Sequence, residues 1–309
     1  MFASAHGFPK FVKVDAAMEH ELRKVGTSPV ICGLDHVVVL VEDIEAGVKA
    51  YELLLGRGPS WRSDGDGSQT VLFTLDNMSL ELMAPAGDTP TAGRIRKAIR
   101  MSGEGLASLC FKVGDIEGAH RRLDRVALKP DPVAVVENRH PDSGLTLHWK
   151  RTRAATDLTR GVRMFFLELA GERPHSAATS ASPVLGLDHV VILTEDIERA
   201  AALYGARLGL DMALDRSHHE WGQLMFFRCG DLIVEVVKRP VADADLTHDK
   251  LWGLSWRVAD IDATRARLVA AGLRVSEVRA GRKPGTRVMS VRDGTCGVHT
   301  LLLERTARA

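Results

Sequence analysis

The stretch GLDHVVVLVEDIE, residues 33–45, decides how this 309-residue chain is built, because it occurs twice. It returns as GLDHVVILTEDIE at residues 186–198, with two differences in thirteen positions and an offset of 153 residues. A repeat whose period is half the chain indicates two related halves, and the length also suits two domains of about 150 residues each. Weaker echoes at 108–116 and 253–261 run from an apolar strand into Asp-Ile inside each half, so we expect four modules.

Each module is predicted to begin with a short apolar strand that ends at an aspartate, and that aspartate is expected to cap a helix. The four expected caps are Asp43, Asp115, Asp196 and Asp260. Apolar residues then recur at helical spacing, glycines end three of the helices, and polar turns separate about three further strands. The sequence therefore predicts an α+β fold of four strand-helix-strand-strand-strand modules, paired into two tandem half-barrel domains.

The expected domains span residues 33–170 and 186–306. Residues 171–185 are rich in serine, alanine and proline, a composition that is typical of a linker. Residues 1–32 form an amino-terminal extension, in which Met18 to Val25 is predicted to make one short helix.

The composition is that of an ordinary globular protein. The chain has 41 basic and 40 acidic side chains, a formal net charge of +1, and 45% hydrophobic residues. This balance excludes a nucleic-acid binder that works by charge alone. No apolar run reaches the roughly 18 residues of a membrane span and no export signal is recognised, so we expect a cytoplasmic protein without nucleic-acid or membrane partners. The four scattered cysteines form no Cys-x-x-Cys pair, which argues against structural zinc or disulfides.

Four polar residues interrupt apolar strands and need an explanation. His36 and His189 lie in the repeated first strand, and Glu81 and Glu235 lie in the middle of the fourth strand of the same module. A buried, ionised carboxylate is costly unless a cation, a metal or several hydrogen bonds compensate it. A curved sheet that brings the first and fourth strands together would place each histidine beside its glutamate. Imidazole with carboxylate is a ligand set for Zn, Mn, Ni or Fe(II), and a buried hydrogen-bonded pair without metal is the alternative.

These residues together resemble those of the vicinal oxygen chelate superfamily, which includes glyoxalase I, extradiol dioxygenases and bleomycin-resistance proteins. The resemblance rests on Leu-Asp-His-Val-Val, the Asp-Ile that starts a helix, and the fourth-strand glutamate, and it covers residues 33–306. The first half is further similar to the glyoxalase-like domain family, through residues 105–109, residues 139–149 and the closing Phe-Phe-Leu-Glu-Leu at 165–169.

The resemblance implies that each half-barrel cleft holds one divalent metal, Zn, Ni, Mn or Fe(II), through residues of its first and last strands. Carried over by position, the ligands are His36, Glu81 and Glu168 in the first half, and His189 and Glu235 in the second. Glu81 and Glu168 are also the expected catalytic residues, because one of them would move a proton.

The chain departs from the family pattern at the remaining ligand positions. Ser108 and Gly253 stand where relatives usually place the histidine of the second module, and Leu301 aligns best with the family's closing glutamate. His299 lies two residues before Leu301 on the same strand face and is the remaining candidate ligand. A solvated or hydrogen-bonded histidine is the alternative for that position.

The leading expectation is a metal-dependent glyoxalase-like enzyme, of isomerase, lyase or dioxygenase type, that acts on a small oxygenated substrate chelated to the metal. The first half, with three candidate ligands, is expected to be the catalytic one. The alternatives are a metal-free protein that binds or sequesters a small molecule, as bleomycin-resistance relatives do, and a chain in which one half only scaffolds the other. Because two halves already supply a pairing, we expect a monomeric pseudo-dimer or a homodimer.

Overall fold

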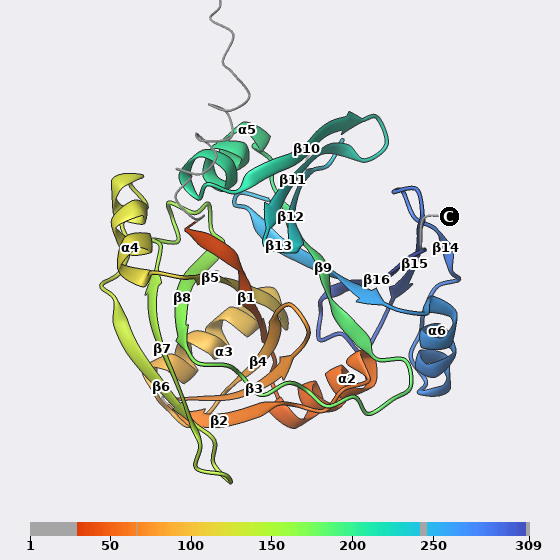
Figure 1. Cartoon of the computed structure of the whole chain (residues 1–309), viewed down its shortest axis with the longest axis horizontal. Helices are drawn as coiled ribbons and strands as arrows, with labels where there is room; N and C mark the ends of the chain where they lie inside the picture. The colour runs from red at the N-terminus through yellow and green to blue at the C-terminus, as the bar shows by residue number, and fades with distance from the viewer. Residues whose placement is uncertain (1–29, 66, 242–245, 307–309) are drawn as a thin grey trace, which may run out of the picture.

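A computed structural model describes residues 30–65, 67–241 and 246–306. The helix expected between Met18 and Val25 lies outside the described residues. The chain forms two eight-stranded mixed sheets, one in each half, which lie next to each other (Figure 1). Among the described residues no helix is long and apolar enough to cross a membrane.

The first sheet has the strand order β2-β3-β4-β1-β5-β8-β7-β6. Its elements, in chain order, are β1 (Ile31–Leu40), α2 (Ile44–Leu55), β2 (Trp61–Gly65), β3 (Ser68–Thr74), β4 (Ser79–Pro85), α3 (Pro90–Ser102), β5 (Gly105–Val113), α4 (Ile116–Arg125), β6 (Ala134–Arg139), β7 (Thr146–Arg153) and β8 (Arg163–Ala170).

The second sheet repeats this topology as β10-β11-β12-β9-β13-β16-β15-β14. Its elements are β9 (Val184–Leu193), α5 (Ile197–Ala201), the π-helix η1 (Ala202–Arg207), β10 (Asp211–His218), β11 (Gly222–Cys229), β12 (Leu232–Lys238), β13 (Lys250–Val258), α6 (Ile261–Ala270), β14 (Arg279–Ala280), β15 (Thr286–Val291) and β16 (His299–Arg305). The predicted class, four modules in two tandem half-barrels, is confirmed.

The four predicted helix caps are formed as expected. Each aspartate accepts a hydrogen bond from the backbone N–H three residues further along, at 2.8 to 3.0 Å. This satisfies one of the backbone donors that the first turn of a helix leaves unpaired. Gly56 then ends α2 in the left-handed conformation, with φ of 62°, which a residue without Cβ adopts at little cost. Repeated cap and turn residues thus set the repeated module.

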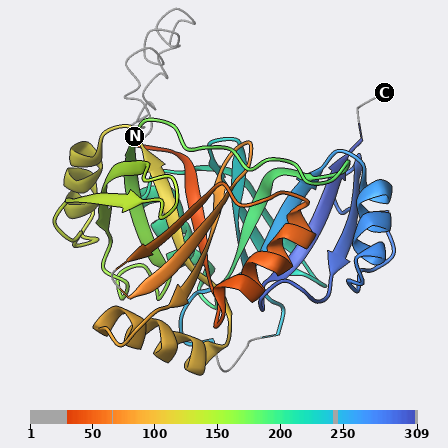
Figure 2. The ribbon, with the colours of Figure 1, turned by 90° about the horizontal axis from the view of Figure 1, so that it is seen from below.

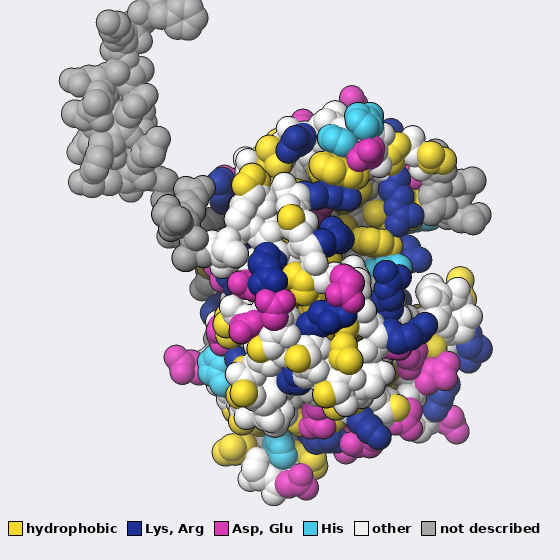
Figure 3. Space-filling view, turned by 90° about the vertical axis from the view of Figure 1, so that its right-hand side faces the viewer, with side chains coloured by type: hydrophobic (Ala, Val, Ile, Leu, Met, Phe, Trp, Pro, Cys, Tyr) yellow, Lys and Arg dark blue, Asp and Glu magenta, His cyan; other side chains and the backbone are white. Residues whose placement is uncertain are grey.

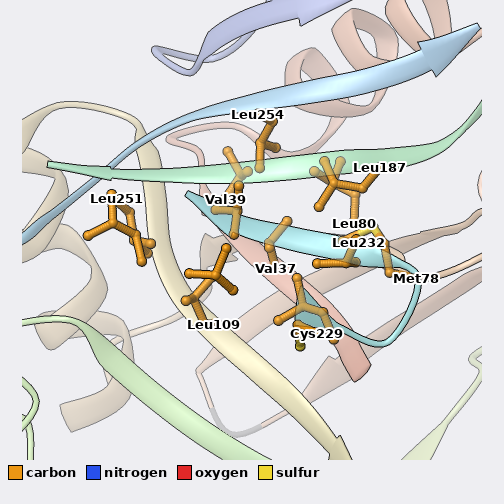
Figure 4. Packing of buried hydrophobic residues seen from close by; sticks show 14 of the residues in the cluster. Val37, Val39, Met78, Leu80, Leu109, Leu187, Cys229, Leu232, Leu251 and Leu254 are labelled. Atoms are coloured by element: carbon orange, nitrogen blue, oxygen red, sulfur yellow. The ribbon is translucent and has the colours of Figure 1, made fainter. Parts of the chain in front are cut away.

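The two halves share one hydrophobic core. The facing sheets contribute to the same cluster of buried residues, which includes Val37, Val39 and Leu109 from the first sheet and Leu187, Leu232 and Leu254 from the second (Figure 4). Figure 2 shows the strands of both halves running through the middle of the molecule, with helices on the outside. The two halves therefore pack against each other and are not independent domains joined only by a flexible linker.

Arginine side chains also join the two halves at the edges of this core. Arg57 Nε donates to the backbone oxygen of Val184 at 2.7 Å, and Arg207 Nε donates to that of Val126 at 2.9 Å. Hydrogen bonds from a charged donor are the stronger kind, and these two reach the start of β9 and the end of α4.

The inner faces of the two sheets differ in how they are covered. In the first half, the edge strands β2 and β6 meet, and Trp61 Nε1 donates to Asn138 Oδ1 at 2.8 Å. Helix α3 lies against the inner face, where Ile95 and Ile99 belong to the same buried cluster as Val38 and its neighbours. The first sheet is therefore nearly a closed barrel with a helix packed into it. In the second half, the described residues between β12 and β13 form no helix.

Candidate functional site

The histidine and glutamate predicted to meet in the first half do so. Strand β1 pairs in parallel with β4, and Val38 lies opposite Glu81 in that register, so His36 and Glu81 share the inner face. His36 Nε2 lies 3.3 Å from Glu81 Oε2. Both side chains are largely buried, with 9% and 16% exposed.

The second half repeats this pair. Strand β9 pairs in parallel with β12, and Glu235 lies opposite Val191, two residues beyond His189. His189 Nε2 lies 3.2 Å from Glu235 Oε2. Identical register in both sheets produces the two contacts, which is why the sequence repeat could predict them.

An aspartate lies behind each imidazole. His36 Nδ1 is 2.6 Å from Asp35 Oδ1, and His189 Nδ1 is 3.0 Å from Asp188 Oδ2. Irregular register in β1 and β9 at these aspartates is a β-bulge, which brings neighbouring side chains to the same region of the sheet. A carboxylate at Nδ1 fixes the ring and directs Nε2 toward the glutamate, as in metal-binding histidines.

An arginine completes each row of charges. Arg173 Nη1 lies 2.5 Å from Asp35 Oδ1, and Arg305 Nη2 binds Asp188 Oδ1 in the second half. In each centre, an arginine therefore contacts an aspartate, the aspartate contacts a histidine, and the histidine contacts a glutamate. Neither the two aspartates nor the two arginines were predicted from the sequence, although Asp35 and Asp188 lie inside the repeated motif.

The charges shift the ionisation of the first centre. Burial alone would raise the pKa of Asp35, but His36 and Arg173 outweigh it and lower the pKa to about 2. Burial alone would lower the pKa of His36, and Cys110, Asp35 and Glu81 together raise it to about 10.

In the second centre, burial would likewise raise the pKa of Asp188, but His189 and Arg305 lower it to about 2. Burial raises the pKa of Glu235, against the charges of His189 and Arg282, which lower it. A carboxyl whose pKa moves upward is a better candidate for proton transfer near neutral pH than an ordinary one.

Glu168 does not join His36 and Glu81. Its Oε2 accepts a hydrogen bond from the backbone N–H of Ile116, at 2.7 Å, at the start of α4. The preceding even-numbered residue, Phe166, belongs to the core on the outer face of the sheet, so Glu168 faces away from His36. Of the three ligands predicted for the first half, the structure therefore brings together His36 and Glu81 and places Glu168 elsewhere.

Strand register explains this misplacement. Glu304 in β16 accepts from the backbone N–H of Ile261 at 3.0 Å, so Glu168 and Glu304 are equivalent helix-capping residues. The residue of β8 that corresponds to Glu81 is Phe165, which lies opposite Cys110. Alternation along Phe-Phe-Leu-Glu-Leu, counted from the apolar residues of the core, was the signal that could have separated Glu168 from the site.

His299 lies apart from the second pair. It begins β16 opposite Gly253 and stacks on Trp252, with ring centroids 4.5 Å apart and an interplanar angle of 24°. Burial, and then the charges of Arg239 and Lys250, lower its pKa. His299 is exposed to solvent, in contrast to His189.

The described part of the chain contains no group of three or more His, Cys, Asp or Glu side chains that could hold a metal ion. Each half brings two donors together. Ser108 and Gly253, at the positions noted above, add none of the usual ligand groups.

A tandem pair of curved sheets, each with an oriented histidine and a glutamate at its centre, defines a protein of the vicinal oxygen chelate class. Family models match both halves: the glyoxalase-like domain covers residues 34–186, and the glyoxalase/bleomycin resistance protein/dioxygenase superfamily covers residues 188–289. The chain belongs to the glyoxalase/bleomycin resistance/dioxygenase superfamily.

Among curated proteins, the chain is similar to an ethylmalonyl-CoA/methylmalonyl-CoA epimerase of Cereibacter sphaeroides. The two are 37% identical over 93 residues, which is 29% of this chain and 67% of the relative.

Two solved structures show the same fold over most of their length. A mutant of 4-hydroxymandelate synthase from Streptomyces coelicolor has a TM-score of 0.65 at 14% identity, covering 90% of this chain and 94% of that one. A catechol 2,3-dioxygenase has a TM-score of 0.60 at 14% identity, covering 90% of each chain. At this identity the likeness concerns the fold alone.

Proposed function

We propose that this chain is a metal-dependent enzyme of glyoxalase-like type, which acts on a small oxygenated substrate in the second half-barrel. The observation that carries the proposal is the His189–Glu235 pair, held from behind by Asp188 on the less covered of the two inner faces. A curated relative that is named an epimerase supports a reaction in which a proton is moved.

The second half is preferred over the first, in contrast to the expectation from the sequence. Helix α3 packs its Ile95 and Ile99 into the first barrel, beside Val38, Leu40 and Cys110. A substrate would have to displace that buried packing, whereas the second sheet carries exposed residues such as His299 at its inner face. The first half then serves as the scaffold, as one of the three expectations above allowed.

The second half offers two of the protein ligands that a divalent metal needs. Nε2 of His189 and Oε2 of Glu235 converge, and the aspartate behind Nδ1 orients the ring as in metal sites, but catalytic zinc sites usually have three protein ligands. His189 and Glu235 would hold the ion, and substrate oxygens or water would occupy its other positions. A metal bound there supplies a Lewis acid that polarises a substrate oxygen.

The chain's own residues orient and move the proton. Asp188 contacts His189 Nδ1, so that Nε2 faces the substrate side. Glu235 would accept or return a proton through the carboxylate oxygen that does not bind the ion. The apolar strands around the pair exclude water, which strengthens each of these electrostatic contacts.

Elemental analysis of the purified protein, loaded with Zn, Mn, Ni or Fe(II), tests this proposal. We expect one metal ion per chain, lost in His189→Ala and Glu235→Gln. The matched variants His36→Ala and Glu81→Gln, where they fold, retain it, as does His299→Ala. Wild-type protein that holds no metal after loading would contradict the proposal.

A metal-free binding protein is the second candidate. The observation in its favour is that neither half supplies a third ligand from the His, Cys, Asp and Glu residues that the structure describes. Tight binding of a small molecule by protein that is free of metal would support this candidate.

A further inference from the structure

The two edges of the second sheet meet over its inner face. Trp221 lies in the turn between β10 and β11, and Arg282 lies in the turn between β14 and β15, while β10 and β14 are the opposite edge strands of that sheet. The Arg282 guanidinium carbon is 4.1 Å from the centre of the Trp221 ring. In Figure 1 the tips of these two hairpins approach each other at the upper right.

This contact closes the second sheet in a different way from the first. In the first half, Trp61 joins the edges by a hydrogen bond to Asn138 and an edge-on contact with the His140 ring, and α3 fills the space inside. In the second half, an exposed cation over an aromatic ring spans the edges, and such contacts are weak. Neither Arg282 nor Trp221 belongs to the buried core, so that separating the two hairpin tips would disturb no core packing.

Several basic side chains lie near the contact between the two hairpin tips. Arg239, Lys250 and Arg282 have no ion pair among the described residues, and Figure 3 shows Lys and Arg side chains gathered among hydrophobic ones on this face. The charge of Arg282 lowers the pKa of Glu235, and the charges of Arg239 and Lys250 lower the pKa of His299.

The acidic groups of the centre do not cancel these charges. Glu235 contacts His189, and Asp188 binds both His189 and Arg305. Within the part of the chain that the structure describes, these three cations therefore have no acidic partner, and such a surplus of positive charge favours a negatively charged ligand.

Aromatic rings supply the other half of a binding surface. Arg239 lies 5.3 Å over the Trp252 ring, which stacks on His299, and His218 stacks on Trp221 with ring centroids 3.8 Å apart. Flat rings beside cations suit a ligand that has both a charged end and a planar or apolar body.

We propose that the second half-barrel binds a small organic anion, a carboxylate or phosphate compound with a planar or apolar body, and that Arg282 grips its charged end. The β14–β15 hairpin then closes over the ligand onto Trp221. This inference rests on the proposed function, in that it assigns a substrate class to the same half.

Calorimetric titration with matched pairs of probes tests the inference. The pairs are malonate with dimethyl malonate, benzoate with methyl benzoate, and phenyl phosphate with phenol, at constant ionic strength. We expect at least one anion to bind tenfold or more tightly than its neutral partner. Arg282→Gln should lower the affinity for that anion at least tenfold, because the substitution removes a charged hydrogen-bond donor.

Lys283→Gln is the matched control, because it removes the same charge from the neighbouring residue of the same hairpin and leaves the Trp221 contact in place. It should change the affinity no more than twofold. Equal weakening by both variants, equal affinity for the neutral probes, or no binding of any probe to folded protein would overturn the inference.

The metal analysis described above separates this inference from the function on which it rests. Protein that holds metal at His189 and Glu235 but shows no preference for anions leaves the proposed function standing and refutes only the substrate class. Protein that prefers anions through Arg282 but holds no metal refutes the metal-dependent enzyme and keeps the anion site.

Discussion

The imidazole of His189 lies 3.2 Å from the carboxylate of Glu235, and the equivalent contact between His36 and Glu81 in the first half measures 3.3 Å. The two polar centres are therefore near copies. The two centres differ in what lies over them. Helix α3 packs into the first barrel, whereas a contact between two hairpin tips spans the second. On this difference rests the proposal that the second half carries the site and the first half is its scaffold.

Removing the buried packing of α3 should destabilise the protein without changing its second half. Ile99 is 5% exposed, and Ile99→Ala should lower the free energy of unfolding by about 2–4 kcal/mol, since it leaves a cavity. Chemical denaturation measures the loss. Met101→Ala, at an exposed position of the same helix, should change stability by less than about 0.5 kcal/mol. A change in metal content of folded Ile99→Ala would contradict the scaffold role.

Replacing Glu168 should behave as the loss of a helix cap. Glu168→Gln weakens the acceptor for the backbone N–H of Ile116, and we expect a cost of about 1 kcal/mol in the free energy of unfolding. Glu304→Gln, at the equivalent cap, should cost a similar amount, and exposed Glu172→Gln should cost little. Loss of bound metal in Glu168→Gln, with stability unchanged, would restore Glu168 to the site.

The protein should lose stability in acid through Asp35. Its pKa is about 2 in the folded chain against an ordinary 3.8, so the stabilisation is present above pH 3.8 and disappears as pH falls through about 2. The shift corresponds to a contribution on the order of 2 kcal/mol. Denaturation of wild type and Asp35→Asn across pH 2–6 measures it. The variant should be less stable at pH 6 and show a flatter profile, and parallel profiles would refute this assignment.

The shared core should make the two halves unfold together. Leu254 is 1% exposed and lies in the cluster formed by both sheets, so Leu254→Ala should cost about 2–5 kcal/mol. Calorimetry should record one transition in wild type and variant, with agreement between calorimetric and van't Hoff enthalpies. Two separated transitions would show that the halves are independent domains.

Much of this arrangement could be predicted from the sequence. The repeat predicted two halves, and the aspartates predicted where the helices start. Period-two alternation predicted that each histidine faces its glutamate. All three features depend on local spacing. The same alternation along β8 places Glu168 with Phe166 on the face opposite to His36, and the predicted position of Glu168 in the site did not take it into account. The resemblance to a family favoured that assignment, although the register makes Phe165 the equivalent of Glu81.

The sequence by itself determined the fold, the four modules and the two histidine–glutamate pairs. The alternation of a strand and the cap of a helix depend only on residues that are close together in the chain. Only the tertiary structure decided which inner face α3 covers, where Glu168 points, and that Arg282 meets Trp221. Those facts depend on contacts between segments far apart in the chain, where sheet curvature and core packing, rather than local spacing, determine which side chains meet.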